Sequence, residues 1–376
     1  MSPFCSSARL DAGLYRLETA AGNALHLSLL VFSTTYVVSF SVIVFMLRFK
    51  LVYSDDYYLP IGDHIFPAQK YRLVHQQLLG KQVADESDFL PPSPATDDDV
   101  RLVHTRDYVD KLRTGMLSAK EELVMEIPFT PNLVKACWLS AGGSIKAAEM
   151  ALRDGVAINV GGGFHHAFAD HGEGFCLIND VAIAIRRMIC DGKIARAMTL
   201  DCDVHQGNGT AAIFTQEPLE PQPLPSWSAP MFAPPHPVNV KETRPGDVFT
   251  ISLHQENNYP AWKPPSSIDV NLPDRTTDAE YLAWLDNALT SALRQFEPDL
   301  ICYLAGADPY AEDQLGGLSL SIDGLKQRDE FVFNVCKSKN IPVMVTFAGG
   351  YARRLEDTVT IHCNTVQAAK EVFNWR

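Results

Sequence analysis

The sequence predicts an α/β protein with three layers, in which a central and mostly parallel β-sheet is covered by helices on both faces. Two observations support this class. From residue 49 onward, short apolar segments of strand length alternate with longer segments of helical periodicity. Polar residues with chemical capacity follow the apolar strands directly, which is where open α/β sheets place their ligands. With 376 residues, 46% of them hydrophobic, the chain is long enough to bury such a core.

Six segments are predicted as buried strands because they are short and mostly apolar. They lie at residues 50–54, 156–160, 195–200, 248–253, 300–304 and 342–347. The helical segments between them supply the crossover connections that parallel strands require.

Seven segments carry the helical period, at residues 67–79, 97–104, 132–153, 180–190, 278–296, 323–338 and 357–373. Gly80 follows the first segment and is typical of a helix C-terminal cap. Thr96 precedes the second as an N-terminal cap, and the acidic residues of the first turn favour the helix dipole. Thr277 and Glu280 form a capping-box pair at the start of the fifth.

A proline-rich insertion, residues 216–247, interrupts this alternation. It holds nine prolines and has no apolar period, and proline is excluded from helix interiors and central strands. We therefore expect an extended surface insertion within one domain. A passive loop is the favoured interpretation, and docking of a partner is the alternative.

An N-terminal extension, residues 1–48, precedes the expected α/β domain at residues 49–376. Residues 24–47 form an apolar run without a charged side chain, and this length is sufficient for a helix to cross a bilayer. The run predicts an apolar helix and a candidate membrane anchor; a poorly ordered extension is the alternative. Basic residues on the two sides of the run balance each other, so the positive-inside rule assigns no orientation.

The composition limits the classes of partner. Lysine and arginine number 32 against 45 aspartates and glutamates, which gives a net charge of −13. This balance argues against direct binding of nucleic acid, which needs a basic surface, and suits a lysine-rich peptide or a polyamine. None of the eight cysteines forms a C-x-x-C pair. They are expected to be reduced in an intracellular protein, either cytoplasmic or nuclear.

The candidate chemistry begins after the third predicted strand. Asp201, Asp203 and His205 recur with a period of two, which places their side chains on one side of an extended segment. Such a set forms a metal half-site, although an isolated D-x-D is usually a turn or a helix cap. Asp308 occupies the equivalent position after another predicted strand and favours the metal site. An Asp–His–Asp set leaves coordination positions open, as catalytic zinc sites do, and harder cations also accept these ligands.

Two further motifs end strands of the same sheet. His165 and His166 follow a run of glycines, and paired histidines near a metal half-site favour acid–base chemistry over simple packing. Tyr351 follows two glycines, and its hydroxyl can donate a hydrogen bond to a developing oxyanion. Phe175 also follows a glycine and, opposite a second aromatic ring, can wall a narrow channel.

The chain contains five separated motifs in a fixed order: GGGFHH, GEGFCLIND, DCDVHQGNG, AGADPY and AGGY. Together they resemble the zinc-dependent histone deacetylase family, whose members have the three-layer arginase/deacetylase fold. The resemblance extends over residues 51–372 and is closest to the class IV branch and its bacterial relatives. It implies removal of acetyl or longer acyl groups from N6-acyl-lysine. Histone tails are one class of substrate, which would make the protein a chromatin regulator.

The resemblance also implies a role for each candidate residue. It makes Asp203, His205 and Asp308 the zinc ligands. His166 becomes the general base and later the general acid, and Tyr351 becomes the donor that polarises the substrate carbonyl.

Three further residues surround the catalytic histidine in this assignment. His165 is an electrostatic neighbour of His166 and is paired with Asp201. Asn208 stands where many family members carry an aspartate. An asparagine cannot carry the negative charge that steadies a protonated His166 in other branches, so the balance between the two histidines is expected to differ.

The remaining implied sites concern the substrate and a second cation. The acyl-lysine channel is assigned to Gly174, Phe175, Tyr259 and Leu315. A structural potassium ion is assigned to Asp201, Asp203, His205, Ser252 and Leu253. A second potassium site is not predicted, because the proline-rich insertion interrupts its expected position after Phe214.

Three alternatives remain at this point. The same hydrolase can act on acetylpolyamines or other small acylated amines. An arginase-like ureohydrolase with two manganese ions would need more aspartates, whereas the chain has Asn208 and Pro309 at the relevant positions. A catalytically silent, membrane-tethered scaffold is disfavoured because every catalytic position is occupied. The oligomeric state is left open.

Overall fold

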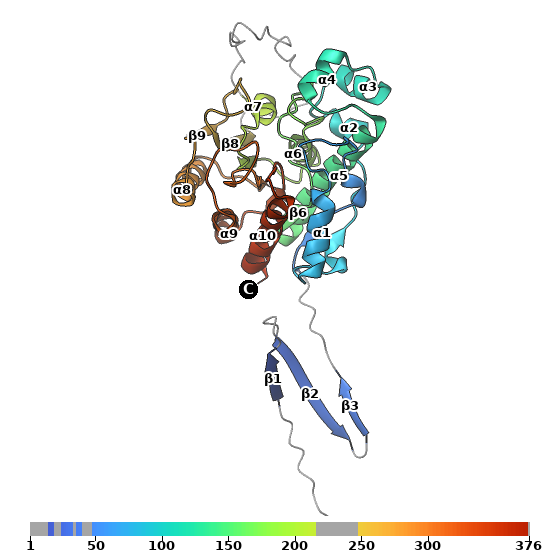
Figure 1. The fold of residues 1–376 in the computed structure, drawn as a ribbon, viewed down its shortest axis with the longest axis vertical. Helices are drawn as coiled ribbons and strands as arrows, with labels where there is room; N and C mark the ends of the chain where they lie inside the picture. The colour runs from blue at the N-terminus through green and yellow to red at the C-terminus, as the bar shows by residue number, and fades with distance from the viewer. Residues whose placement is uncertain (1–13, 19–23, 33–34, 40–46, 216–246, 375–376) are drawn as a thin grey trace, which may run out of the picture. The chain divides into compact units, whose positions relative to one another are not determined.

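The computed structural model describes residues 14–18, 24–32, 35–39, 47–215 and 247–374 of the chain. The chain divides into two compact units, Met1–Met46 and Leu47–Arg376. The smaller unit contains a three-stranded antiparallel sheet in the order β1-β2-β3 (Figure 1). Its strands are β1 Leu14–Glu18, β2 Ala24–Phe32 and β3 Thr35–Ser39.

The predicted apolar helix over residues 24–47 is wrong where the structure describes that run, because residues 24–32 and 35–39 are strands. The run is rich in β-branched and aromatic residues, among them Val31, Tyr36 and Val37, which favour extended backbone. Apolarity and length alone do not separate a spanning helix from such strands. Every helix among the described residues is too short or too polar to cross a bilayer. The rest of the run up to residue 46, and residues 216–246 of the proline-rich insertion, lie outside the described residues.

The larger unit is built on a sheet of eight parallel strands in the order β5-β4-β6-β11-β10-β7-β8-β9. The strands are β4 Lys50–Val52, β5 Phe89–Leu90, β6 Val156–Asn159, β7 Ala197–Asp201, β8 Val248–Gln255, β9 Ile268–Leu272, β10 Leu300–Leu304 and β11 Val343–Thr346. All six predicted strands are present. The residues of β6, β7, β10 and β11 are buried throughout, as a sheet covered on both faces requires.

Helices connect these strands. They are α1 Lys70–Gly80, α2 Asp97–Val100, α3 Arg106–Thr114, α4 Ala119–Met125, α5 Pro131–Asp154, α6 Asp180–Cys190, α7 Asn208–Phe214, α8 Asp278–Gln295, α9 Ile322–Lys339 and α10 Leu355–Phe373. The predicted capping residues Thr96 and Thr277 lie at the starts of α2 and α8, each in a capping box. The helices α3, α4 and α7 were not predicted.

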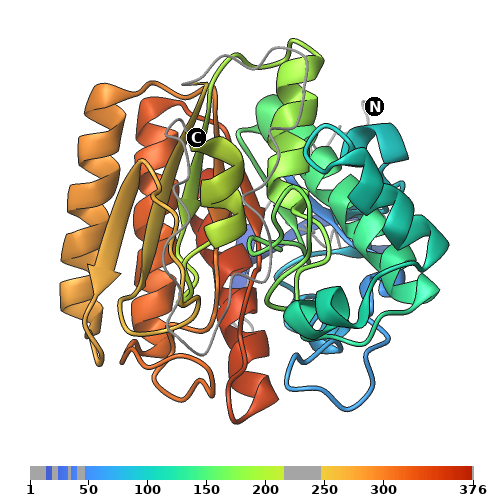
Figure 2. The same ribbon diagram turned by 90° about the horizontal axis from the view of Figure 1, so that it is seen from above.

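The helices cover the sheet in two layers, which confirms the three-layer αβα prediction. On one face α5 packs against α6 and against the central strands. On the other face α10 packs against α1 and α9, and α9 packs against α8. Figure 2 shows the strands between these two groups of helices.

The strand order positions the candidate site. The motif-bearing loops follow β6, β11, β10 and β7, and these four strands are consecutive neighbours in the sheet. Because all four are parallel, their carboxyl ends meet at one edge. Segments separated by nearly 200 residues in the chain therefore bring their side chains to a common point.

Candidate metal centre

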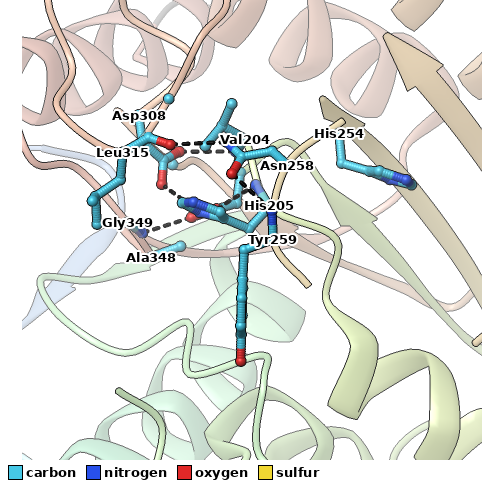
Figure 3. A network of polar contacts seen from close by, with 12 residues as sticks. Val204, His205, His254, Asn258, Tyr259, Asp308, Leu315, Ala348 and Gly349 are labelled. Carbon is cyan, nitrogen blue, oxygen red and sulfur yellow. Dashed lines mark hydrogen bonds and ion pairs between the residues drawn. The ribbon is translucent and has the colours of Figure 1, made fainter. Parts of the chain in front are cut away.

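Three buried side chains converge at this edge of the sheet. Asp203, His205 and Asp308 each offer a ligand atom, and these atoms all lie within 4.8 Å of one another. Nδ1 of His205 is 3.0 Å from Oδ1 of Asp203 and 3.4 Å from Oδ2 of Asp308. Figure 3 shows His205 and Asp308 turned toward each other, with His254 well apart. The spacing fits a single divalent ion gripped by all three residues.

The surroundings of the two carboxylates leave room for such an ion. Oδ1 of Asp308 accepts a hydrogen bond of 2.9 Å from the backbone N–H of Val204, whereas its buried Oδ2 accepts no well-formed hydrogen bond from the described residues and lies 3.4 Å from Nδ1 of His205. A buried carboxylate oxygen without a hydrogen bond is costly unless a cation binds it. A side-chain carbon at Gly306 would lie 2.9 Å from the carboxylates of Asp203 and Asp308, so glycine keeps this space open.

Electrostatics also favours positive charge at this point. Burial raises the pKa of Asp308 to about 7, helped by the charge of Asp203. Burial alone would lower the pKa of His205, but its hydrogen bond with Asp203, its close contact with Asp308 and the charges of both carboxylates outweigh this and raise it to about 10. Two buried carboxylates side by side therefore attract a cation. Asp and His ligands with open coordination positions are typical of catalytic zinc sites.

The paired histidines lie beside this centre, and their rings are 4.0 Å apart. Nδ1 of His165 is 2.7 Å from Oδ2 of Asp201. Burial lowers the pKa of this imidazole, but the charges of Asp201 and Asp203 outweigh burial and raise it to about 9. His165 is therefore suited to carry a positive charge at neutral pH.

His166 has a different environment. Its Nδ1 is 2.7 Å from Oδ1 of Asn208, a neutral amide. Burial, followed by the positive charges at His165 and His205, holds the pKa of His166 well below its usual range. A neutral imidazole has a free lone pair, which a general base requires. The two histidines are thus differentiated by their partners, one a carboxylate and the other an amide.

Tyr351 is buried beside the metal ligands, with its ring 6.4 Å from that of His205. Its ring also packs edge-on against Phe175 at 6.0 Å and Phe66 at 6.1 Å. The backbone N–H of Tyr351 donates a 2.7 Å hydrogen bond to Oδ2 of Asp313. The loop after β11 is therefore fixed by packing and by one buried carboxylate.

The other predicted channel residues lie around the same point. A side-chain carbon at Gly174 would lie 2.8 Å from the hydroxyl of Tyr259 and 2.9 Å from the ring of His166. The Tyr259 ring packs edge-on against His166 at 5.0 Å, and Figure 3 shows it beside His205. The carbonyl of Leu315 accepts a hydrogen bond from Asn258, the neighbour of Tyr259. These contacts bring the predicted channel residues to the rim of the centre.

The residues predicted for potassium are also neighbours. Asp201 of β7 is paired in register with Ser252 of β8, and Leu253 is buried next to it. The assignment of a potassium ion to this group stays a prediction.

Four buried or half-buried residues at the site were not identified from the sequence. Asp180 accepts hydrogen bonds from the backbone of residues 163 and 164, and so holds the turn before the histidines. Asp313 holds the Tyr351 loop, and Glu173 binds Asn208. Lys70 donates from Nζ to the carbonyl of Ala348 at 2.7 Å, with its pKa lowered to about 8 by burial. Asp180 and Glu173 both belong to the GEGFCLIND motif and could have been found there; Asp313 and Lys70 have no local signal.

Residues 64–366 match the family model described as the Histone deacetylase domain. An uncharacterized protein of Picosynechococcus sp. is 36% identical over 326 residues, which cover 86% of this chain and 99% of that protein. Histone deacetylase 2 of Arabidopsis thaliana is 32% identical over 332 residues, covering 83% of this chain and 78% of that protein.

Two solved structures are similar in fold. The HDA15 HD domain gives a TM-score of 0.65 at 21% identity and covers 87% of this chain and 89% of that chain. An acetylpolyamine aminohydrolase from Burkholderia pseudomallei gives a TM-score of 0.64 at 19% identity, with coverage of 85% and 98%. Likeness at this level of identity concerns the fold alone.

Proposed function

The chain belongs to the histone deacetylase family, and from this membership we propose that it is a zinc-dependent amidohydrolase that removes acetyl or longer acyl groups from N6-acyl-lysine. The observation that carries the proposal is the convergence of Asp203, His205 and Asp308 on one point beside a neutral histidine. Histones or other acylated proteins are the proposed substrates, and the class IV branch is the proposed subgroup.

The ligand set defines what the metal would contribute. Asp203, His205 and Asp308 would hold the zinc ion, which when bound supplies a Lewis acid for the amide carbonyl and lowers the pKa of water to about 7. All other roles in the proposed reaction belong to side chains of the protein itself.

His166 is the proposed general base. Its Nδ1 is engaged by Asn208, which leaves Nε2 as the nitrogen that can accept a proton from the attacking water. As the carbon–nitrogen bond breaks, the same nitrogen returns the proton to the departing lysine amine. The charge of the neighbouring His165, set by Asp201, favours the return of that proton.

Tyr351 is the proposed oxyanion donor. Its buried hydroxyl remains protonated, because burial and the charges of Asp203 and Asp308 raise its pKa well above the usual range. A protonated phenol can donate a hydrogen bond to the substrate oxygen as negative charge develops there. The aromatic rings of Phe175 and Phe66 pack around Tyr351 and exclude water from this part of the site.

A second candidate function is deacylation of a small cationic amine such as an acetylpolyamine. The Glu173 carboxylate beside the channel residue Tyr259 favours it, since a fixed negative charge at that position would attract a polyamine. The solved structure of an acetylpolyamine aminohydrolase shares the fold. A structural potassium ion near Asp201 and Ser252 is part of either proposal.

One activity panel tests these alternatives. Zinc-loaded protein is assayed on acetyl-, butyryl- and myristoyl-lysine peptides and on acetylated polyamines, with and without a zinc chelator. Asp203→Ala serves as the ligand-deficient variant, and Asp286→Ala on the exposed face of α8 as its matched control. We expect hydrolysis of acyl-lysine that the chelator abolishes and added zinc restores. A higher kcat/KM on polyamines would assign the second function. No turnover on the whole panel would contradict both and support the silent scaffold.

A further inference from the structure

The neutral partner of His166 is itself held by a charged residue. Oδ1 of Asn208 lies 2.7 Å from Nδ1 of His166, and Nδ2 of Asn208 donates a 2.7 Å hydrogen bond to Oε1 of Glu173. His166 and Asn208 are both buried, and Glu173 is half-buried at the edge of the site. A carboxylate thus reaches the catalytic histidine through one intervening amide.

Only one assignment of donors and acceptors is consistent along the hydrogen bonds that join His166, Asn208 and Glu173. An ionised carboxylate accepts hydrogen bonds and cannot donate them, so Asn208 must turn its NH₂ group toward Glu173. The amide oxygen of Asn208 then faces His166, whose Nδ1 must carry the hydrogen that it accepts. The lone pair of His166 is therefore confined to Nε2, the nitrogen that the proposed reaction uses.

We propose that Glu173 is a positioning residue that fixes the tautomer of His166 through Asn208. The inference rests on the proposed function for its kinetic consequence, but its structural content concerns only which ring nitrogen of His166 holds a hydrogen. Without Glu173 the Asn208 amide can rotate and present either its oxygen or its NH₂ group to His166. The second orientation places the lone pair on Nδ1 and removes the base from the reaction.

Glu173 is held in place from two sides. The hydroxyl of Tyr259 donates a 2.8 Å hydrogen bond to the same Oε1 atom. Nε2 of His171 is 3.6 Å from Oε2, and Nδ1 of that ring is 2.7 Å from Asp170. These contacts anchor the carboxylate toward Asn208 and explain why a single glutamate can determine the amide orientation.

A purely structural role for Glu173 predicts different behaviour. Its backbone pairs with Cys176 in the turn that carries Gly174 and Phe175, so a substitution could act by loosening that turn. A looser turn would change substrate binding and therefore KM. No substitution at residue 208 would then restore the KM of the wild type. The tautomer role instead changes kcat and couples residues 173 and 208 directly.

The kinetic test is a cycle of three variants, Asn208→Asp, Glu173→Gln and the double variant. With Glu173 present, Asp at 208 would place two carboxylates against each other, and we expect kcat to fall about tenfold. In the Glu173→Gln background, an aspartate at position 208 can accept a hydrogen bond from His166 through either carboxylate oxygen. It can also accept a hydrogen bond from the side-chain amide of the glutamine at position 173. There we expect Asn208→Asp to raise kcat about threefold, with KM unchanged. A fall of similar size in both backgrounds, or an effect confined to KM, would overturn the proposal.

The direct test needs no substrate. Protein labelled with ¹⁵N-histidine is examined by NMR, in which the two neutral tautomers of an imidazole have distinct nitrogen shifts. His166 is expected as the Nδ1–H form in the wild type and in Asp286→Ala, a substitution on the exposed face of α8 that leaves Glu173 and its contacts intact. In Glu173→Met a mixture of tautomers is expected. An Nε2–H ring in the wild type, or a pure Nδ1–H ring in Glu173→Met, would overturn the proposal.

The two readouts separate the failure of this inference from the failure of the proposed function. If the wild type hydrolyses no acylated amine but His166 responds to Glu173→Met as expected, the tautomer control stands and the enzymatic proposal falls. If the wild type is active but the tautomer of His166 is the same in Glu173→Met as in the wild type, only the inference about Glu173 is refuted.

Discussion

The backbone N–H of Gly349 donates a hydrogen bond of 2.8 Å to Oδ2 of Asp203. This contact joins the loop after β11 to the candidate metal ligands after β7 (Figure 3). Any side chain at 349 would overlap Oδ2 of Asp308 and lie 2.6 Å from Oδ2 of Asp203. The glycine therefore lets the backbone approach both carboxylates closely enough to orient one without displacing the other.

Gly349→Ala is expected to reduce metal binding while the fold is retained, because the added methyl group occupies the space between the two carboxylates. Zinc per chain, measured by elemental analysis after dialysis, should fall to less than half of the wild-type value. Gly80→Ala is the matched control, since a side chain there meets nothing within 4 Å. Equal zinc content in Gly349→Ala and Gly80→Ala would refute the assigned role of this loop.

Tyr351→Phe is expected to lower kcat by about 10²–10³-fold and to leave the affinity for substrate nearly unchanged. Losing one oxyanion donor typically costs this much, and the aromatic packing with Phe66 and Phe175 is preserved. Steady-state kinetics on the best acylated substrate provide the measurement. Tyr58→Phe, at an exposed tyrosine, serves as the control. An unchanged kcat in Tyr351→Phe would remove this hydroxyl from the mechanism.

Asp313→Asn should lower kcat by about 10- to 100-fold without loss of zinc. Oδ1 of Asp313 accepts from the backbone N–H of Leu315 at 2.8 Å, and Oδ2 accepts from that of Tyr351 at 2.7 Å. An amide can satisfy only one of these contacts, so the Tyr351 loop loses its anchor, and small misplacements of catalytic groups are costly. Kinetics and zinc analysis are compared with Asp286→Asn. Wild-type turnover in Asp313→Asn would show that packing alone positions Tyr351.

The buried His104 is expected to make the fold sensitive to acid. Its Nε2 accepts a 3.0 Å hydrogen bond from the backbone N–H of Asn179, and burial lowers its pKa from 6.5 to about 4. Between these values the unfolded chain binds a proton that the folded chain does not. The contribution of neutral His104 to the free energy of unfolding is therefore fully present above pH 6.5 and is lost as the pH falls. The free energy of unfolding should decrease by about 2 kcal/mol between pH 7 and pH 5 for this reason.

His104→Gln retains an acceptor for Asn179 but cannot titrate. Urea unfolding at pH 7 and pH 5 should show a smaller loss of stability in this variant than in the wild type, by about 2 kcal/mol. The comparison isolates one residue, because the other buried histidines are common to both proteins. The same loss in both proteins would show that His104 does not contribute to the acid sensitivity.

The parallel sheet could be predicted from the sequence because its central strands are buried on both faces and are therefore mostly apolar. The two missed strands lack this signal: Phe89–Leu90 has only two residues, and Ile268–Leu272 is a partly exposed edge strand with polar residues. The missed helix Asn208–Phe214 begins among glycines, which favoured a turn. The apolar run at 24–47 satisfied the length of a spanning helix, but its β-branched residues also favour strands.

At the site, the convergence of Asp203, His205 and Asp308 followed from a general rule, since parallel strands end at a common edge. The roles of Glu173 and Asp313 could not be predicted in this way. Both lie in loops, and their importance comes from hydrogen bonds to Asn208 and to the backbone of Tyr351. Loop contacts of this kind depend on the tertiary arrangement, and no local pattern of residue types encodes them.

The central claim is that one zinc ion is held by the side chains of Asp203, His205 and Asp308. An anomalous-difference map from crystals of the zinc-loaded protein, collected on both sides of the zinc absorption edge, tests it most directly. We expect a single strong peak at about 2.0–2.2 Å from one carboxylate oxygen of each aspartate and from Nδ1 of His205. A peak elsewhere, or no peak within reach of all three residues, would contradict it.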